Sequence, residues 1–196
     1  RERRGLITVG PPALGGRTYP AESEAVIAEL AQRLGWPVLA EFHSGLRKAH
    51  PNILAYPDFC SRIVPKTVPE EPEFVLHFGL LPTSKNVQKF LHAARQVIHV
   101  DTRPGIRLPL KDNLATYRAS PETLLSEVAE CSERPLSPWL HHWLQADRRV
   151  AEALAEESFD TLFEPAVART IQSRIEPDGI LVVSNSMPIR QTDVWL

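Results

Sequence analysis

The sequence contains little cysteine, and none in a pattern that would stabilise a small fold. Only Cys60 and Cys131 occur among the 196 residues. Two thiols so far apart do not form the framework of disulfide bonds that holds small secreted domains together. We therefore expect two buried, reduced cysteines in a cytoplasmic protein.

Long apolar runs and an excess of one charge are also missing. No stretch approaches the roughly 20 apolar residues that cross a bilayer, and the apolar stretch after the basic residues 1–4 is too short for a signal peptide. The formal net charge of -2 provides no field that would attract nucleic acid. Hydrophobic residues make up 43% of the chain, which is enough for a packed core.

Several motifs of catalytic and cofactor sites are absent. The chain has no Walker sequence, no G-x-S-x-G, no H-E-x-x-H and no C-x-x-C. His141 and His142 are adjacent, so on a helix they would point about 100° apart and would not chelate a metal together. Asp101 ends an apolar run, as the ribose-binding acid of dinucleotide folds does, but residues 10–16 (GPPALGG) lack G-x-G-x-x-G. The sequence therefore contains no recognisable motif for a metal site, a cofactor site or a catalytic residue.

What the sequence does contain is an alternation of strands and helices. Apolar runs bounded by turn residues predict strands at 5–10, 37–40, 73–79, 96–101 and 113–119. Apolar periodicity and capping residues predict helices at 21–34 and 84–95 and from 120 onward. The proline-rich stretch 43–72 is expected to be irregular, with one short helix near 59–63. This order is typical of an α/β protein with a Rossmann-like, doubly wound parallel sheet.

The pattern changes after residue 132. Ser137-Pro138 and Glu164-Pro165 each open a predicted helix, the first running to about residue 156. A last strand is predicted at 180–184, followed by the beginning of another helix. We interpret residues 1–135 as a central domain, 136–160 as a helical linker, and 161–196 as the truncated start of a further domain.

Ligands of open α/β sheets bind beyond the carboxyl ends of the strands. The strand at 73–79 leads through Gly79 to Lys85, and either Thr83 or Ser84 can cap the next helix. A lysine in the first turn opposes the helix dipole unless an anion is shared between its ammonium and the free N–H groups. Lys85 is therefore a candidate anion ligand, and the alternative is an exposed lysine in a polar loop.

A second candidate site follows the strand predicted at 180–184. Asn185 and Ser186 lie where this strand meets the next helix, and Arg190 lies about one turn further on. Arginine offers a bidentate fork for carboxylate or phosphate. The alternative is an ordinary Ser/Asn helix cap with a surface arginine.

Four segments resemble the 2-succinyl-5-enolpyruvyl-6-hydroxy-3-cyclohexene-1-carboxylate (SEPHCHC) synthase family, also called MenD, of menaquinone and phylloquinone biosynthesis. They are LGWPVLAEFHSGLR at 34–47, HFGLLPTSK at 77–85, VIHVD at 97–101 and VVSNSMPIRQTD at 182–193. The last is the most specific, since N-S-x-x-x-R after an apolar strand is close to a family signature. The order and spacing match the family's central domain, its helical linker and the opening of its third domain.

The resemblance implies a thiamine-diphosphate-dependent enzyme that decarboxylates 2-oxoglutarate and adds the resulting carbanion to isochorismate. Both substrates are dicarboxylates at neutral pH. By the family pattern, Lys85 would contact substrate carboxylate from the central domain, and Asn185, Ser186 and Arg190 would do so from the third domain. Asn86 stands where some members carry arginine, so a second cation is either missing here or supplied from elsewhere.

The resemblance also implies that thiamine diphosphate and Mg²⁺ belong to other domains. The glutamate that activates the thiamine ring and the GDG…N metal motif are not in this sequence. We expect this chain to bind neither cofactor and to be inactive alone. Its expected partners are the missing amino- and carboxyl-terminal domains, in a homo-oligomer of the cytoplasm.

Two other classes of function remain open at this point. One is a Rossmann-like module that binds a small regulatory acid, with Arg47, Arg103 and Arg107 as candidate contacts. The other is a free-standing nucleotide- or FAD-binding domain. Titration with an aromatic acid, a nucleotide and 2-oxoglutarate would distinguish them.

Overall fold

The computed structural model describes residues 4–12, 21–47, 50–68, 70–103, 108–110, 113–128, 136–159, 161–176 and 179–196. Five strands form one sheet in the order β2-β1-β3-β4-β5, and every neighbouring pair is parallel. The Rossmann-like parallel sheet predicted from the sequence is confirmed. The strands are β1 (Gly5–Val9), β2 (Val38–Ala40), β3 (Phe74–Phe78), β4 (Gln96–Val100) and β5 (Leu114–Tyr117).

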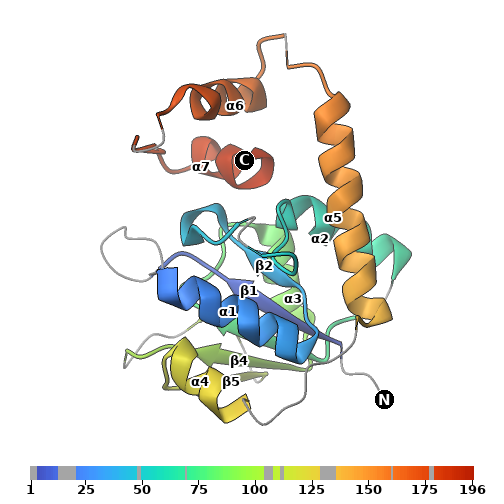
Figure 1. The fold of residues 1–196 in the computed structure, drawn as a ribbon, viewed down its shortest axis with the longest axis vertical. Helices are drawn as coiled ribbons and strands as arrows, with labels where there is room; N and C mark the ends of the chain where they lie inside the picture. The colour runs from blue at the N-terminus through green and yellow to red at the C-terminus, as the bar shows by residue number, and fades with distance from the viewer. Residues whose placement is uncertain are drawn as a thin grey trace.

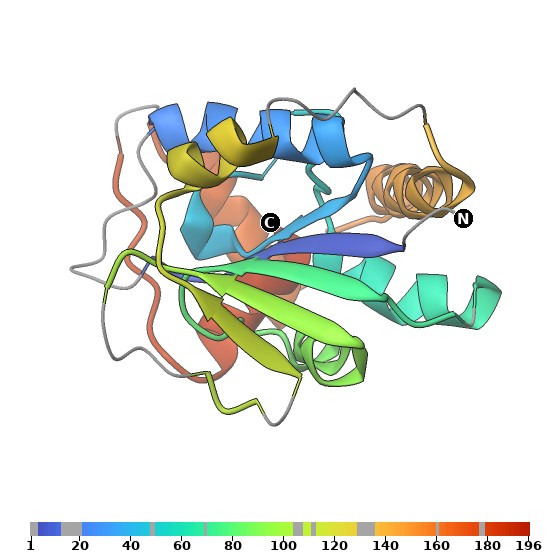
Figure 2. The same ribbon diagram turned by 90° about the horizontal axis from the view of Figure 1, so that it is seen from below.

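Helices cover both faces of this sheet. Helices α1 (Ala21–Leu34) and α4 (Pro121–Val128) lie on one face, and α2 (Pro57–Thr67) and α3 (Lys85–Ala93) lie on the other (Figure 2). Successive strand residues alternate between two apolar clusters: Leu6 belongs to the cluster under α2 and α3, and Ile7 to the cluster under α1. Because both clusters are buried, the inner strands read as nearly continuous apolar runs.

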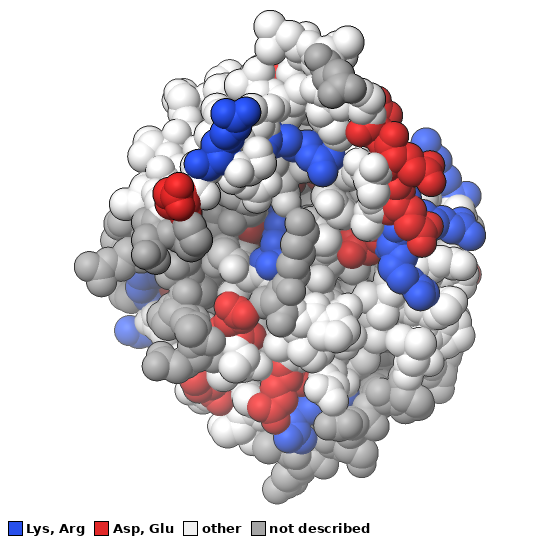
Figure 3. All heavy atoms as spheres, turned by 45° about the horizontal axis from the view of Figure 1, so that its top comes forward, with Lys and Arg blue, Asp and Glu red and all other residues white. Residues whose placement is uncertain are grey.

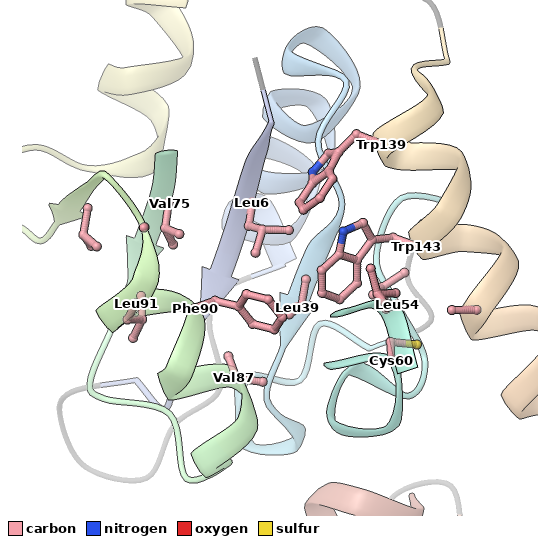
Figure 4. Packing of buried hydrophobic residues seen from close by; sticks show 14 residues of the cluster. Leu6, Leu39, Leu54, Cys60, Val75, Val87, Phe90, Leu91, Trp139 and Trp143 are labelled. Carbon is pink, nitrogen blue, oxygen red and sulfur yellow. The ribbon is translucent and has the colours of Figure 1, made fainter. Parts of the chain in front are cut away.

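The predicted linker helix, α5 (Pro138–Glu156), packs against the first of these clusters. Trp139 and Trp143 point from α5 toward Leu6 and Leu39 of the sheet (Figure 4). The Trp139 indole Nε1 donates to the Gly5 carbonyl oxygen at 2.8 Å. The two indole rings meet edge to face with centroids 5.8 Å apart. The first half of α5 is therefore part of the hydrophobic core of the α/β unit.

The strand predicted at 180–184 is not formed, so this expectation is wrong. The segment pairs with no strand among the described residues, and Ile180 and Val182 are each 87% exposed. Its sequence is suited to a strand, but a strand exists only where a neighbour exchanges hydrogen bonds with it. No described part of the chain provides that neighbour.

The expectation of an irregular segment at 43–72 is also wrong in part. Residues Phe42–Ser44 form a short 3₁₀ helix, η1, and α2 extends over 11 residues rather than a few. Pro57 occupies the first turn of α2, where a missing N–H costs nothing, and Pro65 lies in its last turn. Cys60 is a buried free thiol on the core face of α2, as expected, while Cys131 lies outside the described residues.

Two further helices, α6 (Glu164–Arg174) and α7 (Met187–Trp195), pack together at one end of the molecule (Figure 1). Helix α7 also contacts α2 and η1, so it lies beyond the carboxyl end of β2. The rings of Trp195 and Phe59 meet edge to face, with their centroids 5.1 Å apart. Among the described helices, none has the length and apolarity needed to cross a membrane.

Candidate functional site

The loop between β3 and α3 is held by two buried histidines. Gly79 begins it with φ 80°, a left-handed conformation that favours glycine. His99 Nε2 donates to the Gly79 carbonyl at 3.0 Å, and His77 Nε2 donates to the Leu80 carbonyl at 3.1 Å. His77 Nδ1 then accepts from the Thr8 hydroxyl at 2.8 Å. The course of the chain toward α3 is thus set by the neighbouring strands.

Both histidines are neutral in this arrangement. Burial, with the neighbouring His99, lowers the pKa of His77 to about 3. Burial also lowers the pKa of His99. A neutral imidazole with its proton on Nε2 is the form that can donate to these carbonyls while leaving Nδ1 as an acceptor.

Of the two cap candidates in the sequence, Thr83 and Ser84, Ser84 caps the amino terminus of α3. The Ser84 hydroxyl accepts from the Val87 N–H at 3.2 Å and donates to Asp58 Oδ1 at 2.5 Å. Asn86 Nδ2 donates to the same oxygen at 3.2 Å. Lys85 is the first residue of α3 and is exposed. Asp58, a buried residue of α2 that sequence reasoning missed, therefore fixes the turn that carries Lys85.

Helix α7 carries Arg190, and Asp193 on the same helix is buried against the segment that follows β2. Asp193 Oδ1 accepts from the Phe42 N–H at 2.9 Å and from Arg47 Nη2 at 2.6 Å. Arg47 Nε donates to the Ala40 carbonyl at 3.0 Å. Arg190 itself is exposed. A buried ion pair thus attaches the helix bearing Arg190 to the α/β unit.

Glu41 is the first residue after β2, and it contacts the loop between β3 and α3 that leads to Lys85. Its carboxylate accepts a hydrogen bond from the Thr83 N–H, two residues before Lys85. Burial raises the pKa of Glu41 to about 7, and the nearby Asp193 carboxylate adds to the rise. Sequence reasoning missed Glu41, although a charged residue directly after the buried strand β2 was a signal that could have revealed it.

Lys85 and Arg190 line one pocket of about 230 Å³, which we call the Lys85–Arg190 pocket. Two candidate sites that are far apart in the sequence therefore come together. Asn185 and Ser186 lie on the exposed turn before α7, outside this lining. Ser186 occupies the cap position of α7 with φ 69°, and its side chain makes no cap hydrogen bond. The lining residues are Asp58, Arg62, Thr83, Ser84, Lys85, Asn86, Arg190, Asp193 and Val194.

The balance of charge in the pocket favours an anion. Its carboxylates are both engaged by arginines: Asp193 pairs with Arg47 at 2.6 Å, and Asp58 pairs with Arg62 at 2.5 Å. Lys85 and Arg190 have no ion-pair partner within the described ranges. Elsewhere on this end of the molecule, acidic and basic side chains are interspersed (Figure 3). The pocket can therefore bind an acid through charge-assisted hydrogen bonds.

The alternative sites have less to offer a ligand. The Arg103 guanidinium forms a bidentate contact with the Asp101 carboxylate, with Nε 2.9 Å from Oδ1 and Nη2 2.5 Å from Oδ2. Burial opposes ionisation of Asp101, but the hydrogen bonds from Arg103 outweigh it and lower the pKa of Asp101. Arg47 is occupied by Asp193, and Arg107 lies outside the described residues. Within the described part of the chain, no group of three or more His, Cys, Asp or Glu could hold a metal ion.

The parallel sheet, with the Lys85–Arg190 pocket beyond the carboxyl ends of its strands, defines a Rossmann-like α/β domain. A family model described as "Middle domain of thiamine pyrophosphate" matches residues 1–183. The chain belongs to this family of middle domains.

Several curated relatives are named 2-succinyl-5-enolpyruvyl-6-hydroxy-3-cyclohexene-1-carboxylate synthase. That of Bacillus cytotoxicus is 32% identical over 205 residues, which covers 100% of this chain and 34% of that protein. That of Enterococcus faecalis is 28% identical over 203 residues, covering 100% and 34%. That of Synechococcus elongatus is 31% identical over 204 residues, covering 98% and 33%. The resemblance to SEPHCHC synthases is confirmed, and the chain spans about a third of these relatives' length.

Proposed function

We propose that this chain is the middle portion of a thiamine-diphosphate-dependent synthase of menaquinone or phylloquinone biosynthesis, which decarboxylates 2-oxoglutarate and adds the product to isochorismate. The observation that carries the proposal is the convergence of Lys85 and Arg190 on one pocket. The relatives' names and the matched family support the choice of reaction.

The task of these residues is to bind and orient a dicarboxylate. Arg190 offers a planar fork of donors to one carboxylate, and Lys85 offers a point charge at the amino terminus of α3. Each charge-assisted hydrogen bond contributes about 1.5–3 kcal/mol. Asp58 and Asp193 fix the two helices before the ligand arrives, which reduces the entropy that binding must overcome. Asn185 and Ser186 remain proposed substrate contacts.

The described residues do not fit the cofactor itself. Mg²⁺ bound to a diphosphate takes one or two protein carboxylates as ligands, whereas both carboxylates that line the pocket are already paired with arginines. We therefore place thiamine diphosphate and Mg²⁺ in the rest of the complete polypeptide.

The surface around α6 and α7 supports the proposal that other domains cover it. Ile180 and Val182 are exposed, and residues of α6, α7 and 181–184 line an apolar pocket of about 310 Å³. Exposed apolar patches of this kind mark contact surfaces. In our proposal, residues 1–135, 136–160 and 161–196 are the central domain, the linker and the start of a third domain. Residues 180–184 become a strand when that domain supplies a neighbouring strand.

We extend the proposal to a homo-oligomer in the cytoplasm. The buried free thiol of Cys60 is consistent with a reducing compartment.

An activity comparison tests the function. The complete polypeptide containing this chain, supplied with thiamine diphosphate and Mg²⁺, should consume 2-oxoglutarate in the presence of isochorismate, and the 196-residue chain alone should not. Turnover by the chain alone, or no turnover by the complete polypeptide, would contradict the proposal.

A further inference from the structure

We propose that Arg62 is a further substrate-binding cation of the Lys85–Arg190 pocket, held in place by Asp58; this inference rests on the function proposed above. Arg62 belongs to α2 and to no motif recognised in the sequence. It lines the same pocket as Lys85 and Arg190.

Arg62 is held by Asp58, and its side chain is still exposed to a ligand in the pocket. Its Nη2 lies 2.5 Å from Asp58 Oδ2, and its guanidinium carbon lies 5.7 Å from the centre of the Phe59 ring. Half of the Arg62 side chain is exposed, whereas Asp58 is only 4% exposed. A guanidinium has five N–H donors, so the contact with Asp58 leaves others for a ligand. The contact with Asp58 therefore restrains the Arg62 side chain at the pocket and leaves N–H donors for a ligand.

Asp58 contacts both Arg62 and the two residues that flank Lys85. Its Oδ2 pairs with Arg62, while its Oδ1 accepts from Ser84 and Asn86, the residues on either side of Lys85. One buried carboxylate therefore sets the relative position of two cations from two helices. Arg190 reaches the same pocket from a third helix, α7. Preorganised cations of this kind suit a dianion, because each carboxylate of the ligand can find its own partner.

Arg33 on α1 provides the matched control. It pairs with Glu29 at 2.7 Å with the same i, i+4 spacing as Arg62 and Asp58. Glu29 is 47% exposed, however, and Arg33 is not among the residues that line the pocket. An effect that follows only from breaking a helical ion pair would appear in both arginines.

The test uses the complete polypeptide with Arg62→Gln, Arg62→Lys and Arg33→Gln. The inhibition constants of succinate, a dianion, and butyrate, a monoanion, are measured against 2-oxoglutarate, together with KM and kcat. We expect Arg62→Gln to weaken succinate about tenfold and butyrate by less than about threefold, in line with one lost charge-assisted hydrogen bond. KM should rise more than kcat falls. Arg62→Lys should lie between, and Arg33→Gln should match the wild type.

Lys85→Ala and Arg190→Ala separate this inference from the function on which it rests. If both weaken succinate while Arg62→Gln does not, the role of Arg62 is overturned and the proposed function stands. If Arg62→Gln weakens succinate and butyrate equally and lowers the melting temperature, Arg62 only neutralises Asp58, and the inference fails. If Lys85→Ala and Arg190→Ala bind succinate like the wild type, the proposed function fails.

Discussion

The guanidinium of Arg47 lies 2.6 Å from the carboxylate of Asp193, and both side chains are almost fully buried, at 6% and 3% exposed. The contact joins the segment after β2 to α7, the helix that carries Arg190. Burial lowers the pKa of Arg47 and raises that of Asp193, and in each case the partner's charge opposes the shift. The pair is therefore costly to bury and costly to break.

Removing one partner of this pair should destabilise the protein strongly. Arg47→Met leaves Asp193 buried without its cation, which costs about 3–5 kcal/mol of unfolding free energy, while Arg47→Met with Asp193→Leu should lose less than the sum of the single variants. Urea denaturation measures both. Arg33→Gln, which breaks an exposed pair, should change stability by less than about 1 kcal/mol. A similarly small loss for Arg47→Met would show that the pair is not buried in solution.

Glu41 should make stability fall as the pH rises. Its pKa is raised from 4.5 to about 7 in the folded protein, so its stabilising contribution is complete below pH 4.5 and is lost as the pH rises through 7. Glu41→Gln should flatten this dependence, with a difference on the order of 3 kcal/mol between pH 4.5 and 8. Urea denaturation of both proteins at the two pH values gives the difference. Parallel pH profiles would show that Glu41 ionises normally.

His77 should make the stability of the protein fall as the pH falls, the opposite of the dependence expected from Glu41. Its pKa is lowered from 6.5 to about 3, so its contribution is complete above pH 6.5 and is lost as the pH falls toward 3. His77→Gln retains a donor for the Leu80 carbonyl but does not titrate, so it should be less sensitive to acid. Unfolding free energies between pH 7 and 4 check this. An equal acid sensitivity would assign the effect to other groups, His99 among them.

Trp143 and Trp139 should fix α5 on the sheet to different degrees. Trp143→Ala opens a cavity in a fully buried site and should cost about 3–5 kcal/mol. Trp139→Phe keeps most of the apolar contact but loses the hydrogen bond to Gly5, which should cost about 1 kcal/mol. Leu136→Ala, at a residue 59% exposed, is the control and should be nearly neutral. A small effect of Trp143→Ala would mean that α5 is not docked.

Lys85→Ala and Arg190→Ala should affect activity but not stability, because both side chains are exposed. In the complete polypeptide each should lower kcat/KM for 2-oxoglutarate by roughly 10- to 100-fold, the effect of one charge-assisted contact. Steady-state kinetics and thermal denaturation separate the two properties. Lys89→Ala, on the same helix but outside the pocket lining, is the control. Unchanged kinetics in Arg190→Ala would remove Arg190 from the site.

The fold could be predicted well because its signals are local. The apolar runs at β1, β3 and β4 and the caps at Ser84 and Ser137 are properties of a few neighbouring residues, and the structure contains each of them. Helix α2 is longer than the proline-rich composition of residues 43–72 predicts. Pro57 in its first turn and Pro65 in its last interrupt little.

The sequence by itself determined the alternation of strands and helices, the parallel sheet and the candidate cations Lys85 and Arg190. Only the tertiary structure placed those two cations at one pocket with Arg62, buried Glu41 and Asp193, and left residues 180–184 unpaired. Helix capping and apolar periodicity act between neighbours along the chain. Burial, pKa shifts and strand pairing depend instead on groups that only folding brings together.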